Sequence, residues 1–83
     1  MVIIYTKRYC VFCVLAKQFF ESNFVAYKEI DISNNIEKLN QLKSETGFMT
    51  LPQIFVGGKF VGGFTEMMEK INSGELKLPA SAS

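Results

Sequence analysis

The chain has 83 residues, of which 48% are hydrophobic, and nine basic and eight acidic side chains give it a net charge of +1. A chain of this length forms one domain with one core, and this charge balance gives no reason to expect a nucleic-acid or membrane partner. No apolar run approaches the ~20 residues of a membrane-spanning helix. The first residues also lack the charged leader of a signal peptide. We therefore expect a single cytoplasmic domain over residues 1–83, with a frayed tail at 79–83.

The first apolar run, Val2 to Thr6, predicts a strand buried on both faces of a sheet. After a loop at residues 7–9, a helical pattern begins at Cys10 and continues to Ser22. The chain's two cysteines, Cys10 and Cys13, therefore lie at a strand-to-helix junction. A helix N-terminus lowers a thiol pKa from ~8.5 to ~3.5–7.5, and the thiolate is the nucleophile of disulfide exchange. Cys13, one helical turn later, is placed to resolve the mixed disulfide.

Other uses of a cysteine pair fit this sequence less well. Lys17 follows Cys13 by one turn and adds positive charge near the pair. A zinc or iron site needs four ligands, whereas the chain has two cysteines and no histidine. A metal site would need a second chain or bound thiols, and two inert core thiols are the other alternative. Spacing and context favour redox chemistry.

The middle of the chain predicts a strand and a helix. Residues 27–32 alternate in polarity, which is typical of a half-exposed edge strand. Asn34, with Glu37 three residues later, predicts a capping box at the start of a helix that ends before Gly47. The polar composition of this helix indicates that it buries one stripe only.

The last third predicts a hairpin and a helix. Pro52 opens an apolar strand at residues 54–56, and the glycine pair 57–58 predicts a tight turn into a strand at 59–61. Gly62-Gly63 comes next, and Thr65 is a candidate cap for a helix to Asn72. From the residues alone, Gly62-Gly63 fits a plain turn as well as a ligand contact, and Pro52 is expected to be trans. The predicted order βαβαββα indicates an α/β fold with a mixed four-stranded sheet covered by three helices.

The order of the elements and three motifs together resemble a dithiol glutaredoxin of the thioredoxin-like fold over Val2 to Leu78. The motifs are Tyr5-Thr6-Lys7 before Cys10-Val11-Phe12-Cys13, then Thr50-Leu51-Pro52-Gln53-Ile54-Phe55, then Gly62-Gly63-Phe64-Thr65. The resemblance implies a glutathione-dependent thiol–disulfide oxidoreductase that acts on protein disulfides and glutathionylated proteins. It also implies glutathione as co-substrate, no metal, and a monomer.

The resemblance assigns roles to single residues. Cys10 would be the nucleophile and Cys13 the resolving thiol, and Lys7 would bind the glycine carboxylate of glutathione. Pro52 would be cis and the Leu51 backbone would pair with the cysteinyl part. The remaining glutathione contacts would be Phe12, Thr50, Gly63, Phe64, Thr65 and Glu66, the last four around the γ-glutamyl end.

Several positions depart from the usual pattern of the family, among them Thr65-Glu66, which replaces a common acidic or Thr-Asp pair. Val11 and Phe12 replace a common Pro-Tyr pair, and Phe48 and Met49 stand where Arg or Gln often helps to bind the glycine carboxylate. We expect a shifted redox potential of unpredicted direction. Two alternatives stay open: a hydrogen donor served by thioredoxin reductase, and a non-enzymatic iron–sulfur cluster carrier.

Overall fold

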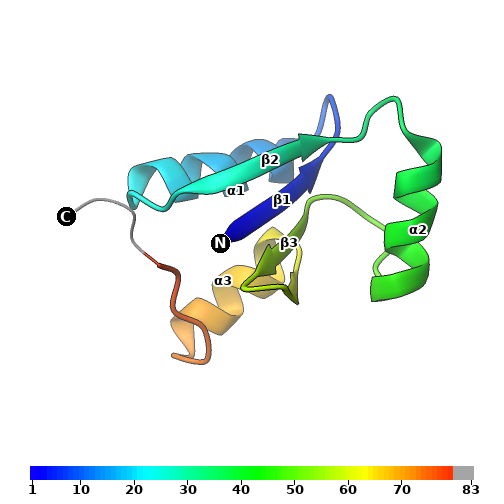
Figure 1. The fold of residues 1–83 in the computed structure, drawn as a ribbon. Coiled ribbons are helices and arrows are strands. Elements are labelled where there is room, and N and C mark those ends of the chain that lie inside the picture. Colours follow the sequence, from blue (N-terminus) through cyan, green and yellow to red (C-terminus); the bar gives the residue numbers. More distant parts are fainter. Residues whose placement is uncertain (80–83) are drawn as a thin grey trace.

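The computed structural model describes residues 1–79 and contains four strands and three helices (Figure 1). Along the chain they are β1 (Val2–Thr6), α1 (Val11–Ser22), β2 (Tyr27–Asp31), α2 (Ile36–Thr46), β3 (Gln53–Val56), β4 (Lys59–Gly62) and α3 (Phe64–Asn72). The strands form one sheet in the order β2-β1-β3-β4, in which β1 pairs parallel with β2 and antiparallel with β3. The predicted fold is confirmed. Residues 80–83, most of the expected frayed tail, lie outside the described part.

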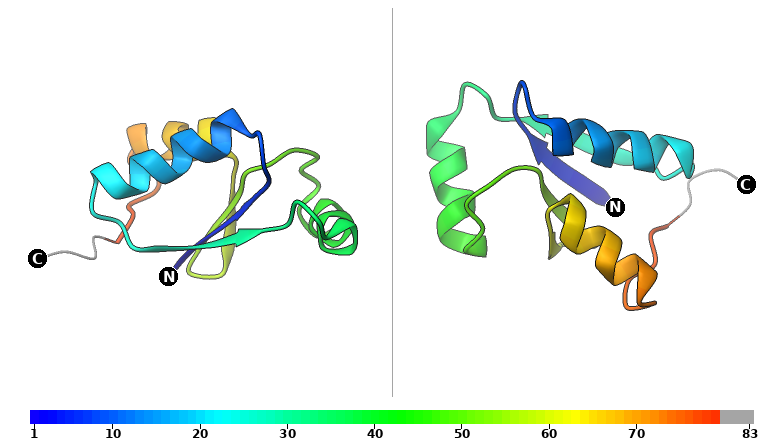
Figure 2. Two further views of the ribbon diagram at one scale, coloured as in Figure 1. Left: turned by 90° about the horizontal axis from the view of Figure 1, so that it is seen from above. Right: turned by 180° about the vertical axis from the view of Figure 1, so that it is seen from behind.

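One face of the sheet carries the main core. Helices α1 and α3 lie side by side on that face (Figure 2). Val2, Ile4 and Thr6 of β1 are fully buried there, and Phe20 of α1 and Met67 of α3 pack into the same layer. This layer fixes the start of α1, and with it the two cysteines, above the end of β1.

The opposite face of the sheet is only partly covered, which corrects the expectation that β1 is buried on both faces. Ile3 and Tyr5 of β1 are half-buried. Helix α2 lies toward one end of the strands (Figure 2), where Leu42 packs with Ile32 and Leu51. Apart from Ile36, which is exposed, the remaining surface of α2 is polar, as its composition predicted. No helix within residues 1–79 is long and apolar enough to cross a bilayer.

The start of α2 differs from the prediction by one residue. Asn35, and not Asn34, is the N-cap, and its Oδ1 accepts a hydrogen bond of 3.0 Å from the Lys38 backbone N–H. The Oδ1 of Asn34 instead accepts a 3.0 Å bond from the Arg8 guanidinium. The sequence pattern favoured Asn34 because Glu37 follows it by three residues, but the Arg8 contact engages the Asn34 side chain and Asn35 caps the helix. The helix ends as predicted at Gly47, whose φ of 75° is a left-handed conformation.

Candidate active site

Cys10 and Cys13 are joined as a disulfide at the N-terminus of α1. Cys10 is the N-cap of the helix, with extended backbone angles of −115° and 105°, and its Sγ accepts the Cys13 N–H at 3.2 Å. The first turn of α1 contains no acidic residue. The positive end of the helix dipole therefore faces the Cys10 sulfur without a competing anion, which favours the thiolate of the reduced protein.

The two sulfurs differ in access. Cys13 is 2% exposed, whereas Cys10 is half-buried and reaches the surface. The Cys10 Sγ lies 3.5 Å from the Leu51 carbonyl oxygen, at the rim of a small cavity. An incoming disulfide meets Cys10 first, because Cys13 is covered by the core. This asymmetry is what the predicted roles of nucleophile and resolving thiol require.

A cavity of about 180 Å³, here called the Pro52 cavity, opens beside Cys10 between α1, the loop before β3 and the start of α3. The Leu51–Pro52 peptide bond is cis, as the resemblance implied. The cavity brings together eight of the nine residues predicted to bind glutathione: Phe12, Thr50, Leu51, Pro52, Gly63, Phe64, Thr65 and Glu66. Lys7 is the exception, since it lines a different cavity on the other side of the cysteines. The binding roles of all nine remain predictions.

The start of α3 is built differently from the prediction, which made Thr65 the cap. Gly63 is the N-cap, and its backbone N–H donates to the Glu66 carboxylate at 3.0 Å. Thr65 lies inside the first turn. Glycine is needed before the helix because a Cβ on Gly62 would approach the Glu66 Cβ to 2.6 Å. The glycine pair therefore has a structural reason, the close approach of Glu66, as well as its place in the cavity wall.

Aromatic rings form much of the Pro52 cavity wall. Phe12 and Phe64 stack with ring centroids 6.2 Å apart. Phe48 closes another side and packs edge-on against Phe60 at 5.3 Å. Phe12 lies in the first turn of α1 and Phe64 in the first turn of α3. Packing between α1 and α3 thus sets the position of this apolar pair.

Gln53 supports the site and was assigned no role from the sequence. Its side chain is fully buried. The amide nitrogen donates to the carbonyl oxygens of Phe48 at 2.9 Å and Thr50 at 3.3 Å, and the amide oxygen accepts from the Thr46 hydroxyl at 2.9 Å. These bonds hold the loop that forms one wall of the Pro52 cavity. The sequence does offer a signal for this role, because Gln53 is a polar residue between Pro52 and the apolar residues of a strand.

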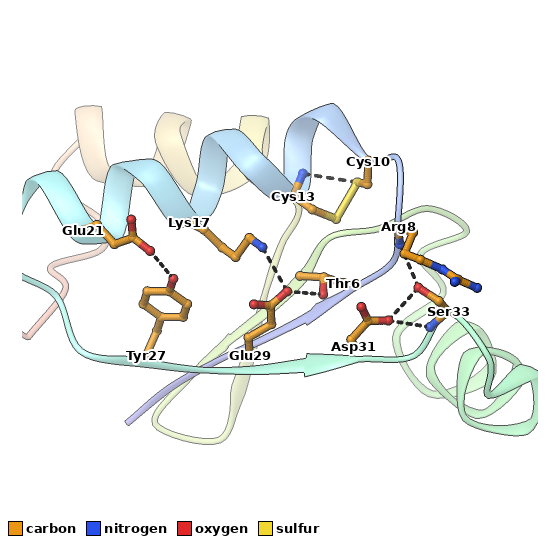
Figure 3. A network of polar contacts seen from close by, with 10 residues as sticks. All are labelled: Thr6, Arg8, Cys10, Cys13, Lys17, Glu21, Tyr27, Glu29, Asp31 and Ser33. Atoms are coloured by element: carbon orange, nitrogen blue, oxygen red, sulfur yellow. Dashed lines mark hydrogen bonds and ion pairs between the residues drawn. A yellow bond between two sulfur atoms is a disulfide. The ribbon is translucent and has the colours of Figure 1, made fainter.

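A second cavity of about 530 Å³, the α1–β2 cavity, adjoins the other side of the cysteines, and both Cys10 and Cys13 line it. Figure 3 shows Lys17 reaching from α1 toward Glu29 on β2, below the disulfide. The Lys17 Nζ lies 3.1 Å from the Glu29 Oε2, which also accepts the Thr6 hydroxyl at 2.7 Å. Lys17 was expected to add positive charge near the cysteines. Its charge is balanced by Glu29 instead.

Asp31 adds a second carboxylate to the α1–β2 cavity. It accepts hydrogen bonds from the Ser33 backbone N–H at 2.8 Å and the Ser33 hydroxyl at 2.6 Å (Figure 3). These two bonds, with the nearby charge of Arg8, hold the pKa of the Asp31 carboxyl below its usual value. No group of three or more His, Cys, Asp and Glu side chains within residues 1–79 is arranged to hold a metal ion.

Comparisons with known proteins agree with this geometry. The family model described as Glutaredoxin matches residues 2–61. A glutaredoxin-C6 from Oryza sativa subsp. japonica is 36% identical over 78 residues, which cover 90% of this chain and 70% of that protein. A glutaredoxin from Pseudomonas aeruginosa is 33% identical over 81 residues, covering 98% of this chain and 96% of that protein.

Solved structures give the same result. A buckwheat glutaredoxin–glutathione complex superposes with a TM-score of 0.85 at 31% identity, over 90% of this chain and 71% of that one. The cysteine pair at the start of α1, the cis proline beside it and these matches lead to one conclusion. The chain belongs to the glutaredoxin family and is a disulfide oxidoreductase.

Proposed function

We propose that the protein is a glutathione-dependent oxidoreductase that reduces glutathionylated proteins and protein disulfides, and that it works as a monomer in the cytoplasm. One observation carries the proposal. The Pro52 cavity is lined by eight predicted glutathione contacts. One of them is Leu51, whose carbonyl oxygen lies 3.5 Å from the Cys10 sulfur. A tripeptide thiol bound in this cavity has its sulfur beside the nucleophile. The buckwheat glutaredoxin of similar structure was solved as a glutathione complex, which supports the proposal.

The groups of the cavity match the γ-glutamyl end of glutathione. The backbone N–H groups of Phe64 and Thr65 belong to the first turn of α3, where no helical carbonyl is available to them. They suit the α-carboxylate of glutathione, and the positive end of the helix dipole adds to this. The Glu66 carboxylate lies beside them and suits the ammonium group. Its bond to Gly63 holds it in place.

Deglutathionylation needs one exchange and one regeneration. The Cys10 thiolate attacks the glutathione sulfur of the mixed disulfide, a new S–S bond forms to Cys10, and the protein thiolate leaves and takes up a proton. The thiolate of a second glutathione then attacks the bound glutathione sulfur. This releases glutathione disulfide and returns Cys10 as a thiolate. The net reaction converts the mixed disulfide and one free glutathione into the protein thiol and glutathione disulfide, and Cys13 is not required.

Reduction of a protein disulfide uses both cysteines. Cys10 attacks one sulfur of the target, and the other target sulfur leaves as a thiolate. Cys13, after loss of its proton, attacks the Cys10 sulfur of the mixed disulfide, which frees the second target thiolate and leaves the Cys10–Cys13 disulfide found in the structure. Two glutathione molecules then reduce that bond and form glutathione disulfide.

The proposal is tested by a glutathione-coupled assay on a glutathionylated substrate. Wild type, Cys10→Ser and Cys13→Ser are compared. We expect Cys13→Ser to keep deglutathionylation activity and Cys10→Ser to lose it, because only Cys10 reaches the surface. Activity in Cys10→Ser would overturn the assignment of the nucleophile. A wild type that is inactive with glutathione would overturn the proposed function.

One observation favours a second candidate, reduction by thioredoxin reductase. No cationic side chain is among the residues that line the Pro52 cavity, and Phe48 stands in its wall. The glycine carboxylate of glutathione therefore depends on Lys7, which lies across the cysteines. If Lys7 does not reach it, glutathione binds weakly and a protein reductant becomes the better donor.

A further inference from the structure

The α1–β2 cavity has no occupant in the function proposed above. A mixed disulfide has two halves, and two cavities flank the Cys10–Cys13 pair. The Pro52 cavity is assigned to the glutathionyl half, which leaves the larger cavity, at about 530 Å³, for the other half. The α1–β2 cavity has room for side chains of a polypeptide next to the target cysteine.

The charged side chains that line this cavity carry a net positive charge, because three of them are cations and two are carboxylates. Both of its carboxylates are already engaged, Glu29 by Thr6 and Lys17 and Asp31 by Ser33. Lys17 is paired with Glu29, whereas Lys7 and Arg8, the other two cations of the cavity, form no ion pair among residues 1–79.

Arg8 donates one side-chain bond, of 3.0 Å, to the Asn34 amide oxygen, which leaves further guanidinium N–H groups available. The Lys7 ammonium has no hydrogen bond or ion pair among residues 1–79. Electrostatic complementarity then favours an anionic group next to the target sulfur.

Part of the cavity wall is apolar and exposed. On the α1 side, Val11 is 70% exposed and Val14 is 46% exposed, and the Tyr9 ring in the preceding loop is fully exposed. Apolar side chains gathered on the surface beside a nucleophile are typical of a contact region for another protein. They give a polypeptide apolar area to bury that a small hydrophilic thiol does not use.

We propose that the α1–β2 cavity binds the polypeptide around the target cysteine, and that it selects a cysteine flanked by an apolar residue and by Asp or Glu. The acidic side chain meets Arg8, and the apolar one packs on Val11 and Val14. This inference rests on the proposed function, since it uses the same Cys10 chemistry. A second glutathione molecule, also anionic, is the competing occupant that the test separates.

The test uses three glutathionylated peptides of one sequence that differ only at the residue next to the cysteine, which is Glu, Gln or Lys. The value of kcat/KM is measured for each peptide at low ionic strength. The enzymes are wild type, Arg8→Glu, Val14→Glu and a control, Lys59→Glu. Lys59 is exposed in β4 beside Val56, which pairs with Val2 at the end of β1 remote from the cysteines. It gives the same change in net charge as Arg8→Glu.

The readout is the ratio of kcat/KM for the Glu peptide to that for the Lys peptide, in which effects on the nucleophile cancel. An exposed ion pair contributes about 0.2–1 kcal/mol, and the Glu peptide gains this attraction where the Lys peptide meets a repulsion of similar size, so we expect a wild-type ratio of roughly twofold to thirtyfold. Arg8→Glu should bring the ratio below one, Val14→Glu should lower it, and Lys59→Glu should leave it unchanged. Added salt should reduce the wild-type ratio.

Three results overturn the inference. The first is a wild-type ratio near one, and the second is a ratio that Arg8→Glu leaves unchanged. The third is a rise in the KM for glutathione in Arg8→Glu that is equal for every peptide, which would assign the cavity to a second glutathione. Failure of the proposed function looks different, because wild type would then turn over none of the peptides with glutathione.

Discussion

At the scale of single residues, the site depends on side chains that never touch a substrate. The loop containing Thr50, Leu51 and Pro52 has no helix or strand of its own, and buried Gln53 fastens it through three hydrogen bonds. A buried polar group is stabilising only while its partners are present. The geometry beside Cys10 thus depends on an amide directly behind Pro52.

Gln53→Leu should destabilise the protein by about 2–4 kcal/mol, because it leaves the Phe48 and Thr50 carbonyl oxygens without the donor that they share. Urea unfolding measures the loss. Gln41→Leu is the matched control: Gln41 is exposed on α2, so the same substitution should change stability by less than about 0.5 kcal/mol. Equal effects of the two substitutions would contradict the role of Gln53.

At the scale of elements, two alanine variants at the start of α2 show which asparagine caps the helix. Asn35→Ala removes the bond to the Lys38 N–H and should cost about 1 kcal/mol. Asn34→Ala removes only an exposed bond to Arg8 and should cost clearly less. Unfolding of the two variants in urea decides between the positions. A larger loss in Asn34→Ala would restore the capping box expected from the sequence.

A hydrogen bond between α1 and β2 makes the stability of the protein depend on pH. The Tyr27 hydroxyl donates to the Glu21 carboxylate at 2.5 Å (Figure 3). Burial, and then this hydrogen bond to an anion, raise the pKa of Tyr27 from 10.0 to about 12. The folded protein therefore holds the phenolic proton more tightly than the unfolded chain does. This contribution to stability is complete below pH 10 and is lost as the pH rises toward 12.

The loss of stability between about pH 9 and about pH 11 should be smaller in Tyr27→Phe than in wild type, because phenylalanine has no proton to lose. Urea unfolding at both pH values gives the two differences, and deprotonation of other groups affects both proteins alike. An equal loss in both proteins would show that the Tyr27–Glu21 contact does not shift the titration.

At the scale of the whole molecule, periodic signals predicted the architecture and side-chain contacts determined the details. Alternating and helical patterns are local, so the strands and helices were found within a residue or two. The helix caps at Asn35 and Gly63 were missed because another possible cap residue, Asn34 or Thr65, lies within two positions of each and matched the capping pattern better. The half-open face beside Tyr5 was missed because the hydrophobicity of a strand does not say what covers it.

The candidate site shows the same division. The motif residues of the Pro52 cavity were predicted from the resemblance, and they do meet in one place. The support from Gln53 and the pairing of Lys17 with Glu29 depend on three-dimensional neighbours that no spacing in the sequence reveals. The separation of Lys7 from the other predicted contacts likewise depends on the three-dimensional structure and could not be predicted from the sequence.

The central claim is that glutathione is the reductant, and one comparison tests it most directly. Oxidised wild-type protein, with the Cys10–Cys13 disulfide formed, is mixed either with glutathione, glutathione reductase and NADPH, or with thioredoxin reductase and NADPH. The rate of thiol formation is followed in both mixtures. We predict fast reduction by glutathione and slow reduction by thioredoxin reductase, since the Pro52 cavity lies beside the Cys10 sulfur. Fast reduction by thioredoxin reductase, with none by glutathione, would contradict the proposed function.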